Sequence, residues 1–219
     1  WSRLVGSEMC IRDRYKDNLQ HLLPKVSKTA NVKHMRSLDY YELPNLINEL
    51  FELKTTSSLA LIFKISTAAR TSEVIGAQWN EFDLTNKIWT IPASRMKKRR
   101  EHVVPLNDLA CMIINNMPKH NSSEFVFLNN SKKSHIDNNK MNVTLKTYLP
   151  EFHKKTVPHG FRSSFRNWAE ENYNFSRRAV ELCLSHTNKN KVENAYLRSN
   201  LFGKRQQICL LYTSDAADD

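Results

Sequence analysis

The stretch SSLALIFKISTAARTSEV at residues 57–74 joins an apolar helical pattern to an arginine with a glutamate three residues later. Its apolar residues recur at the spacing of one helix face, which predicts a core helix over Ser57–Ala69. Arg70 then stands at the helix end, with Glu73 one turn away, where a carboxylate can orient the guanidinium group. An arginine at a helix end is more often merely solvated, so Arg70 indicates a functional site only in combination with the motifs described below.

The segments on either side predict a mainly α fold with one small antiparallel β-sheet, an α+β class. A second core helix is expected over Tyr40–Leu53, and an Asn-, Lys- and Ser-rich surface loop over Asn129–Asn142 that leads into another helix. Strands are expected at 82–84, 87–92 and 102–106, a brief strand-like run at 125–128, and further helices at 107–117, 161–171, 176–184 and 191–207.

The 219-residue chain carries 33 Lys and Arg against 22 Asp and Glu, a formal charge of +11. A polyanionic partner is the natural expectation for such a balance. No apolar run reaches the length of a membrane span, and the N-terminus lacks the order of a signal peptide. We therefore expect a globular intracellular protein without a membrane partner.

Both ends resemble conceptual translations of transposase-type sequencing adapters, LVGSEMCIRD at 4–13 and CLLYTSDAADD at 209–219. Residues 1–13 and 209–219 are accordingly expected to be non-native segments. Removing them leaves a more basic chain, because the second segment contributes three acidic residues and no basic one. Four cysteines at scattered positions define neither a disulfide framework nor a zinc site, and a reducing compartment fits them: Cys10, Cys111, Cys183 and Cys209.

A phosphate-binding and proton-transfer pattern occurs in PHGFR, residues 158–162. His159 and Arg162 are expected on the first turn of a helix, where one side chain can move a proton while the other holds phosphate oxygens. The alternative is a capping histidine beside a surface arginine. A zinc site through His153, His159 and His186 is a further option, which the nearby Arg162 and the high positive charge disfavour.

The basic loop SRMKKRRE, residues 94–101, is predicted to connect two strands. A lysine lowered into a groove by such a turn could protonate a leaving 5′ oxygen, and Lys97 is the candidate. The simpler alternative is a patch that contacts the DNA backbone, formed by Lys97 and its basic neighbours. The DNA-binding candidates are Arg95, Lys98, Arg99 and Arg100.

In LSHTNKNKVENAYLRS, His186 precedes Tyr196 by ten residues. A phenol is a weak nucleophile at its ordinary pKa near 10, so it needs cationic neighbours or a base to attack at neutral pH. Tyr148 and Tyr173 lack such a histidine and are interpreted as packing residues. Tyr212 is set aside because it falls in the suspect C-terminal segment.

The motifs TAARTSEV, RMKKRREHVVPL, PHGFRSSFRNWAEE and LSHTNKNKVENAYLRS resemble, in order and spacing, the catalytic domain of tyrosine recombinases, especially integrases of prophages and genomic islands. The resemblance implies a catalytic domain over 38–208 with a shortened C-terminal helix, preceded at 14–37 by the tail of a core-binding domain and a linker. It implies that Tyr196 is the nucleophile that forms a 3′-phosphotyrosine. The implied roles of the other residues are a phosphate clamp (Arg70, Arg162), a general acid on the 5′ oxygen (Lys97), an acid/base partner (His159), a hydrogen-bond donor to phosphate (His186) and a support behind the site (Glu73).

By the same resemblance the chain would need no cofactor or metal and would act on duplex DNA attachment sites, integrating or excising a mobile element. A homotetramer on DNA, DNA-bending and directionality accessory proteins, and a nucleoid-associated place in a bacterial cytoplasm are implied for the full-length protein. Two alternatives remain open: relaxation of DNA as by type IB topoisomerases, or a basic DNA-binding module without catalysis.

Overall fold

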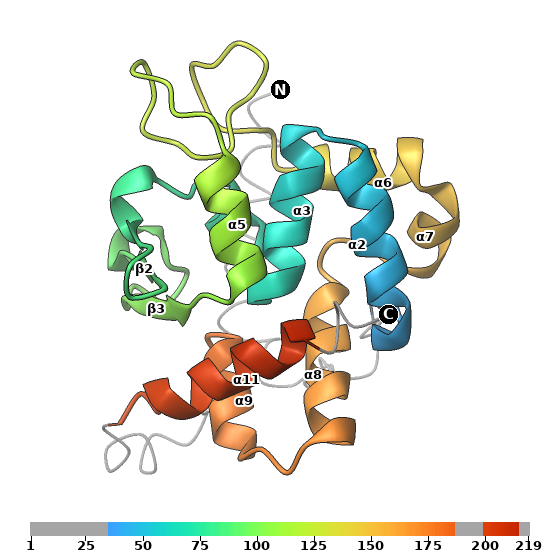
Figure 1. The fold of residues 1–219 in the computed structure, drawn as a ribbon, viewed down its shortest axis with the longest axis vertical. Helices are drawn as coiled ribbons and strands as arrows, with labels where there is room; N and C mark the ends of the chain where they lie inside the picture. The colour runs from blue at the N-terminus through green and yellow to red at the C-terminus, as the bar shows by residue number, and fades with distance from the viewer. Residues whose placement is uncertain (1–34, 187–198, 215–219) are drawn as a thin grey trace, which may run out of the picture. The chain divides into compact units, whose positions relative to one another are not determined.

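The computed structural model describes residues 35–186 and 199–214, and α3 is the helix on which the fold is built (Figure 1). Helices α2, α5, α6 and α11 each pack against α3, and α9 and α8 pack against α11. The helices have these bounds: α2 Leu43–Glu52, α3 Thr56–Thr67, α4 Thr71–Ile75, α5 Asp108–Asn116, α6 Lys140–Tyr148, α7 Pro150–Lys155, α8 Phe161–Asn172, α9 Arg177–Cys183 and α11 Phe202–Ser214.

Helix α3 begins and ends at residues with clear local causes. The Thr55 hydroxyl accepts the Ser58 backbone N–H at 3.1 Å, and the Ser58 hydroxyl accepts the Thr55 N–H at 3.1 Å, a reciprocal N-terminal cap. Ala68 ends the helix in the left-handed region with φ of 50°, a conformation that costs a non-glycine residue free energy. The turn after α3 is therefore a strained one that other contacts have to hold.

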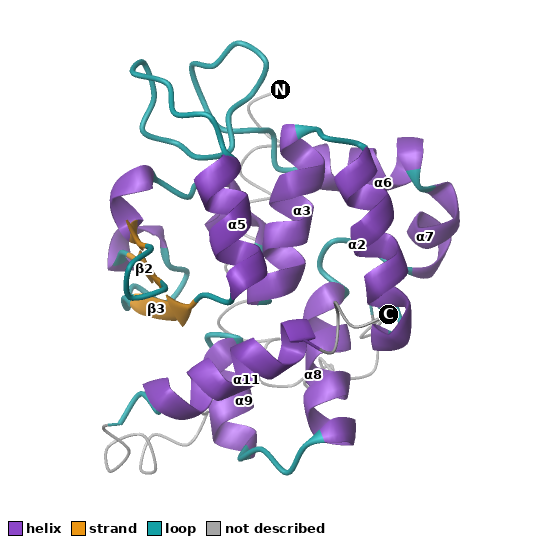
Figure 2. Ribbon diagram, viewed as in Figure 1, coloured by secondary structure: helices purple, strands orange, loops and turns teal. Residues whose placement is uncertain are grey.

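The predicted antiparallel sheet is confirmed, with strand order β1-β2-β3 (Figure 2). Phe82 lies opposite Trp89, and Trp89 lies opposite Val104. The sheet is joined to α3 by aromatic packing, since the Phe63 ring lies 5.3 Å from Trp89 and 5.6 Å from Phe127 between ring centroids. The strands are β1 Phe82–Asp83, β2 Ile88–Ile91 and β3 His102–Pro105, and the 3-10 turns are η2 Tyr40–Glu42, η3 Trp79–Glu81 and η4 Ala93–Arg95.

The mainly helical α+β class is thus confirmed, with differences in detail. The strand expected at 125–128 is reduced to two isolated bridges, Gln78 with Phe125 and Leu128 with His135. The short helices α4 and α7 are additions that the apolar spacing did not predict, because each is too brief to display a helical period. No helix within the described ranges has the length and apolar character needed to cross a membrane.

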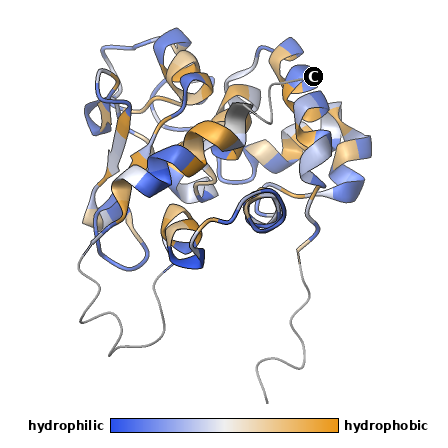
Figure 3. Ribbon diagram, turned by 60° about the horizontal axis from the view of Figure 1, so that its bottom comes forward, coloured by the Kyte–Doolittle hydropathy of each residue, from blue (hydrophilic) through white to orange (hydrophobic). Residues whose placement is uncertain are grey.

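The C-terminal helix differs from its expected bounds of 191–207. Residues 187–198 lie outside the described part of the chain, and α11 continues past Ile208 to Ser214, changing from hydrophilic to hydrophobic along its length (Figure 3). Tyr212 is buried, with its ring 4.9 Å from both Phe165 and Trp168 between centroids. Part of the 209–219 segment therefore packs on α8, whereas its adapter origin stays a prediction.

The start of α8 provides a test of the fold, because a Cβ added at Gly160 would lie 2.0 Å from the Arg36 carbonyl oxygen and 2.9 Å from the Thr156 hydroxyl. We expect Gly160→Ala to lower the free energy of unfolding by about 2 kcal/mol, since backbone has to move to relieve the overlap. Gly203→Ala is the matched control, because no atom lies within 4 Å of its added Cβ. Urea denaturation of the three chains measures the difference, and equal effects of both substitutions would contradict it.

Candidate active site

Arg162 lies on the first turn of α8 and is 5% exposed. Its Nη1 donates to the Ala68 carbonyl at 2.5 Å and its Nη2 to the Leu184 carbonyl at 2.5 Å. Burial, and next the charge of Arg70, lower the pKa of Arg162 to about 10. The guanidinium group is still charged at neutral pH, and it links the end of α3 to the end of α9.

Arg70 precedes α4 and forms a compact pair with Glu73. The Glu73 Oε1 accepts from Arg70 Nη1 at 2.6 Å, and Oε2 accepts the Arg70 backbone N–H at 2.8 Å. Burial raises the pKa of the Glu73 carboxyl, but the hydrogen bonds from Arg70 outweigh burial and hold it below its ordinary value. The carboxylate therefore fixes both the helix start and the guanidinium group, as expected for a supporting residue.

The two arginines converge on one carbonyl. Arg70 Nη2 donates to the Leu184 oxygen at 3.3 Å and to the Ser185 oxygen at 3.3 Å, and Arg162 Nη2 donates to the same Leu184 oxygen. A guanidinium group carries five N–H donors, and contacts among the described residues use three in each arginine. Two like charges lie side by side with donors left over, which is an arrangement that binds an anion.

His186 borders this pair and is fixed by two hydrogen bonds. Its Nδ1 lies 2.6 Å from Glu181 Oε2, and its Nε2 lies 3.2 Å from Arg162 Nη2. Since an arginine can only donate, Nε2 accepts, and we assign the proton to Nδ1. Burial lowers the pKa of His186 against the opposing effect of Glu181. In this neutral form His186 accepts from Arg162, so donation to a phosphate requires a second proton.

His159 lies in the turn before α8, so it precedes the helix on whose first turn it was expected. It is exposed, and its carbonyl accepts the Arg162 backbone N–H at 3.3 Å. Burial of part of the ring, followed by the charges of Lys64 and Arg162, lowers the pKa of His159. A neutral imidazole at the edge of the arginine pair is suited to accept a proton.

The basic loop after η4 presents four charged side chains to solvent. Lys97, Lys98, Arg99 and Arg100 are exposed, and no contact within the described ranges joins Lys97 to Arg70 or Arg162. Lys97 thus lies in the predicted strand connection, exposed, and its role as a general acid stays a prediction.

Arg95, also predicted to contact DNA, is paired within the protein. Its Nε and Nη2 donate to the two carboxylate oxygens of Glu81 at 2.8 and 2.6 Å, and its Nη1 donates to the Glu73 carbonyl at 3.2 Å. Gly76 leaves room for this side chain, because a Cβ there would lie 2.6 Å from Arg95 Nη1. Arg95 therefore supports the strand connection and α4, and its predicted contact with DNA stays a prediction.

Tyr196, the predicted nucleophile, lies outside the described residues. Among the competing tyrosines, Tyr148 is 58% exposed, which corrects its interpretation as a packing residue, whereas Tyr173 stacks on Phe175 with centroids 4.9 Å apart. Tyr212 is fully buried, and burial raises the pKa of its phenol. A buried phenol of that kind is unsuited to nucleophilic attack.

Two residues near the arginines were missed from the sequence. Lys64 is 0% exposed in the last turn of α3, and its charge acts on Arg162 and His159. On β3, burial first and then the charge of Arg205 lower the pKa of His102 to about 4. The signal for Lys64 was present in the sequence as a single charge inside the apolar run LALIFKIS.

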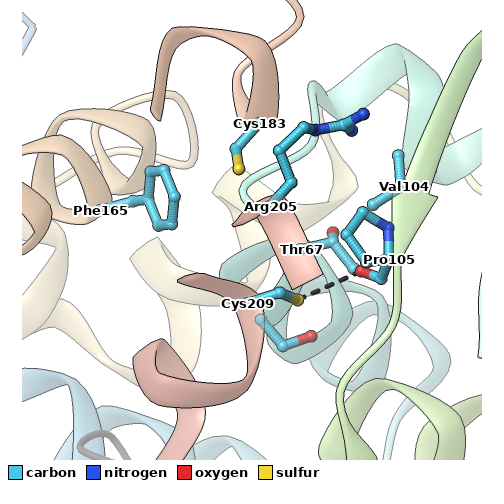
Figure 4. Close-up of a pocket in the computed structure, with 8 residues that line it drawn as sticks. Thr67, Val104, Pro105, Phe165, Cys183, Arg205 and Cys209 are labelled. Carbon is cyan, nitrogen blue, oxygen red and sulfur yellow. Dashed lines mark hydrogen bonds between the residues drawn. The ribbon is translucent and has the colours of Figure 1, made fainter. Parts of the chain in front are cut away.

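A small cavity of about 10 Å³ lies beside the site, between α11, β3, α3 and α8 (Figure 4). Cys209 of α11 donates from Sγ to the Pro105 carbonyl across it at 3.1 Å, and Phe165 and Arg205 also line it. This volume is at the lower limit for one water molecule. In the described part of the chain, no three His, Cys, Asp or Glu side chains are grouped to hold a metal ion.

Solved structures with the same fold define the class of this domain. An integrase of mycobacterium phage Brujita has a TM-score of 0.61 at 15% identity, covering 93% of this chain and 64% of that one. A lambda integrase dimer bound to a core site has a TM-score of 0.56 at 15% identity, covering 87% of this chain and 69% of that one. The fold is that of a tyrosine recombinase catalytic domain.

A sequence profile of the phage integrase family matches residues 36–201, and the chain belongs to that family. Prophage integrase IntA of Escherichia coli K12 is 33% identical over 188 residues, 84% of this chain and 45% of IntA. The integrase of enterobacteria phage P4 is 25% identical over 206 residues, 87% of this chain and 47% of that integrase. The chain thus spans about half the length of the curated relatives it matches.

The Glu73 carboxylate yields a stability prediction with a defined pH dependence. We expect Glu73→Gln to lower the free energy of unfolding by about 2 kcal/mol near pH 7, because it removes one partner of a buried charged pair. The folded-state pKa of Glu73 lies below the ordinary value of 4.5, so the wild-type advantage is complete above about pH 5 and is lost as the pH falls through the folded pKa.

Urea denaturation near pH 7, 5 and 3 measures this difference, with the exposed Glu101→Gln as the control. A deficit of Glu73→Gln that stays constant down to about pH 3 would mean that the charge of the carboxylate is not what stabilises the fold.

Proposed function

We propose that this chain is the catalytic part of a site-specific DNA recombinase that cleaves and rejoins duplex DNA through a 3′-phosphotyrosine intermediate. The observation that carries the proposal is the convergence of Arg70 and Arg162 on the Leu184 carbonyl, with donors of both groups left over. Membership in the phage integrase family supports the same activity. The relatives named above are integrases, which favours recombination over the relaxation of supercoiled DNA by a topoisomerase.

The two arginines would bind the nonbridging oxygens of the scissile phosphodiester. Attack concentrates negative charge on those oxygens, and two guanidinium groups from separate segments stabilise that charge without a metal ion. Each arginine is already oriented by the protein, Arg70 by Glu73 and Arg162 by the Ala68 and Leu184 carbonyls. Little reorganisation would then accompany the charge that develops in the transition state.

Strand transfer would proceed by exchange of one phosphate ester for another. The Tyr196 oxygen attacks phosphorus, the bond from phosphorus to the 5′ oxygen breaks, and Lys97 protonates that leaving oxygen. His159, neutral at pH 7, accepts the phenol proton. Attack by a 5′ hydroxyl on the phosphotyrosine reverses these steps and releases the phenol, so no external energy source is consumed. His186 would donate to the phosphate once its second nitrogen is protonated.

For the whole protein we propose duplex attachment sites as substrate and integration or excision of a mobile element as outcome, in a bacterial cytoplasm. A homotetramer on DNA, with DNA-bending and directionality proteins as accessory factors, is part of this proposal. The DNA-bound lambda integrase dimer is consistent with assembly on DNA in proteins of this fold.

The decisive test is trapping of the covalent intermediate. The chain and its Tyr196→Phe variant are incubated with a nicked suicide duplex of candidate attachment DNA and then separated by denaturing electrophoresis. We expect a protein-linked 3′ strand with the unaltered chain and none with the variant, because phenylalanine has no nucleophilic oxygen. A longer chain that spans the full length of the relatives serves as the control, because it tests whether cleavage needs segments outside this sequence. Failure of that longer chain to form the covalent link would overturn the proposal.

DNA binding itself should be weak in sequence preference and strongly dependent on salt. We expect affinity to fall steeply as salt is raised from about 50 to 200 mM, and Arg99→Gln with Arg100→Gln to reduce the slope of log K against log salt by about 2. Lys154→Gln is the control, because Lys154 is already paired with Glu151 at 2.7 Å. Fluorescence anisotropy with a labelled duplex measures the slopes, and slopes unchanged by the double variant would exclude the loop as a contact.

A further inference from the structure

Lys64 is a buried charge that the proposed chemistry does not use. It lies in the last turn of α3 with none of its surface exposed, and its Nζ donates to the Ala69 carbonyl at 2.8 Å. No carboxylate in the described ranges forms an ion pair with it, since the nearby Glu73 is bound by Arg70. Burying an ammonium group without a carboxylate partner costs folding free energy, so some other interaction has to favour this position.

Lys64 and Arg162 together hold the strained turn that leads to Arg70. Ala68 has φ of 50°, its carbonyl accepts from Arg162, and the next carbonyl, that of Ala69, accepts from Lys64. The two cations therefore fix successive peptide groups immediately before Arg70. Strained conformations of this kind persist where the surroundings over-determine them.

The charged groups around Lys64 are those of the arginine pair. Glu73 faces Lys64 from the first turn of α4, Arg70 faces it from the residue before α4, and Arg162 faces it from α8. His159 responds to the charge of Lys64 and also to that of His186, which follows α9. Burial, and next the charge of Arg162, lower the pKa of Lys64 to about 7, against the opposing effect of Glu73.

We propose, resting on the phosphate site described above, that Lys64 is a positioning residue: its side-chain nitrogen fixes the Ala68–Arg70 turn, and the neutral amine gains a proton when DNA binds, which adds positive charge behind the bound phosphate. In the free protein the two arginine charges oppose protonation of Lys64. A phosphodiester anion bound by Arg70 and Arg162 offsets those charges and favours the protonated amine. DNA binding and protonation of Lys64 are thus linked, and each strengthens the other.

Proton uptake on DNA binding tests this linkage without any catalysis. Titration calorimetry of a duplex of about 20 base pairs, at low salt and about pH 7.5 in two buffers of different ionisation enthalpy, yields the protons taken up per chain. We expect roughly half a proton for the unaltered chain, clearly less for Lys64→Met, and no change for the exposed Lys146→Met control. Equal uptake by Lys64→Met and the unaltered chain would overturn the proposal.

The unaltered chain also supplies a readout that does not depend on how a variant folds. Its uptake should extend to about pH 9, because Lys64 starts from a higher pKa in the free protein than His159 and His186, whose pKa values burial lowers. Uptake confined to pH values below about 6.5 would assign the protons to the histidines and overturn the proposal.

Covalent trapping separates the charge of Lys64 from its hydrogen bond. A neutral amine still donates to the Ala69 carbonyl but no longer attracts the phosphate. The cleavage rate of the unaltered chain should therefore exceed that of Lys64→Met by about tenfold near pH 6.5. This ratio should become smaller as the pH is raised towards about 9. A ratio independent of pH would mean a structural role alone.

The two proposals fail in different ways. Covalent complex without proton uptake at Lys64 removes only the role of Lys64. Loss of both DNA binding and covalent complex removes the proposed function and, with it, the phosphate on which this inference rests.

Discussion

The Arg162 guanidinium group is the contact on which the site depends. It donates to Ala68 at the end of α3 and to Leu184 at the end of α9, while its own backbone begins α8. The bond to Ala68 joins residues 94 positions apart in the chain, and the bond to Leu184 joins residues 22 positions apart. Each of the two carbonyls stands at a helix terminus, where backbone oxygens lack partners within the helix. The same side chain thus completes two helix ends, and its remaining donors are those that we propose bind a phosphate.

This arrangement has an electrostatic cost that suits the proposed function. Arg70, Arg162 and Lys64 bring positive charge to one buried place, and Glu73 compensates only part of it. The hydrogen bonds to backbone carbonyls make the cost tolerable, because carbonyl dipoles replace some of the lost hydration. In the proposed function the phosphate of DNA supplies the remaining negative charge. A site that is partly unsatisfied without its ligand binds that ligand strongly when it arrives.

The sequence predicts some of the side-chain partners in this site and misses others. Arg70 and Glu73 are three residues apart, and their pairing follows from helix geometry alone. The pairing of Arg95 with Glu81 was not predicted, because the two residues are 14 positions apart across a sheet whose register the sequence pattern does not contain. Lys64 was overlooked because hydrophobic periodicity groups residues by face and does not ask where a single charge inside that face would find a partner.

The order of elements, the α+β class and the basic character follow from local patterns, since apolar spacing and charge are properties of neighbouring residues. The family resemblance likewise rests on short motifs in a given order. The meeting of Arg70 and Arg162 at the Leu184 carbonyl, the inward orientation of Arg95 and the burial of Lys64 are matters of tertiary structure. Each depends on contacts between residues distant in the chain, and the strength of those contacts comes from exclusion of water, which no local pattern records.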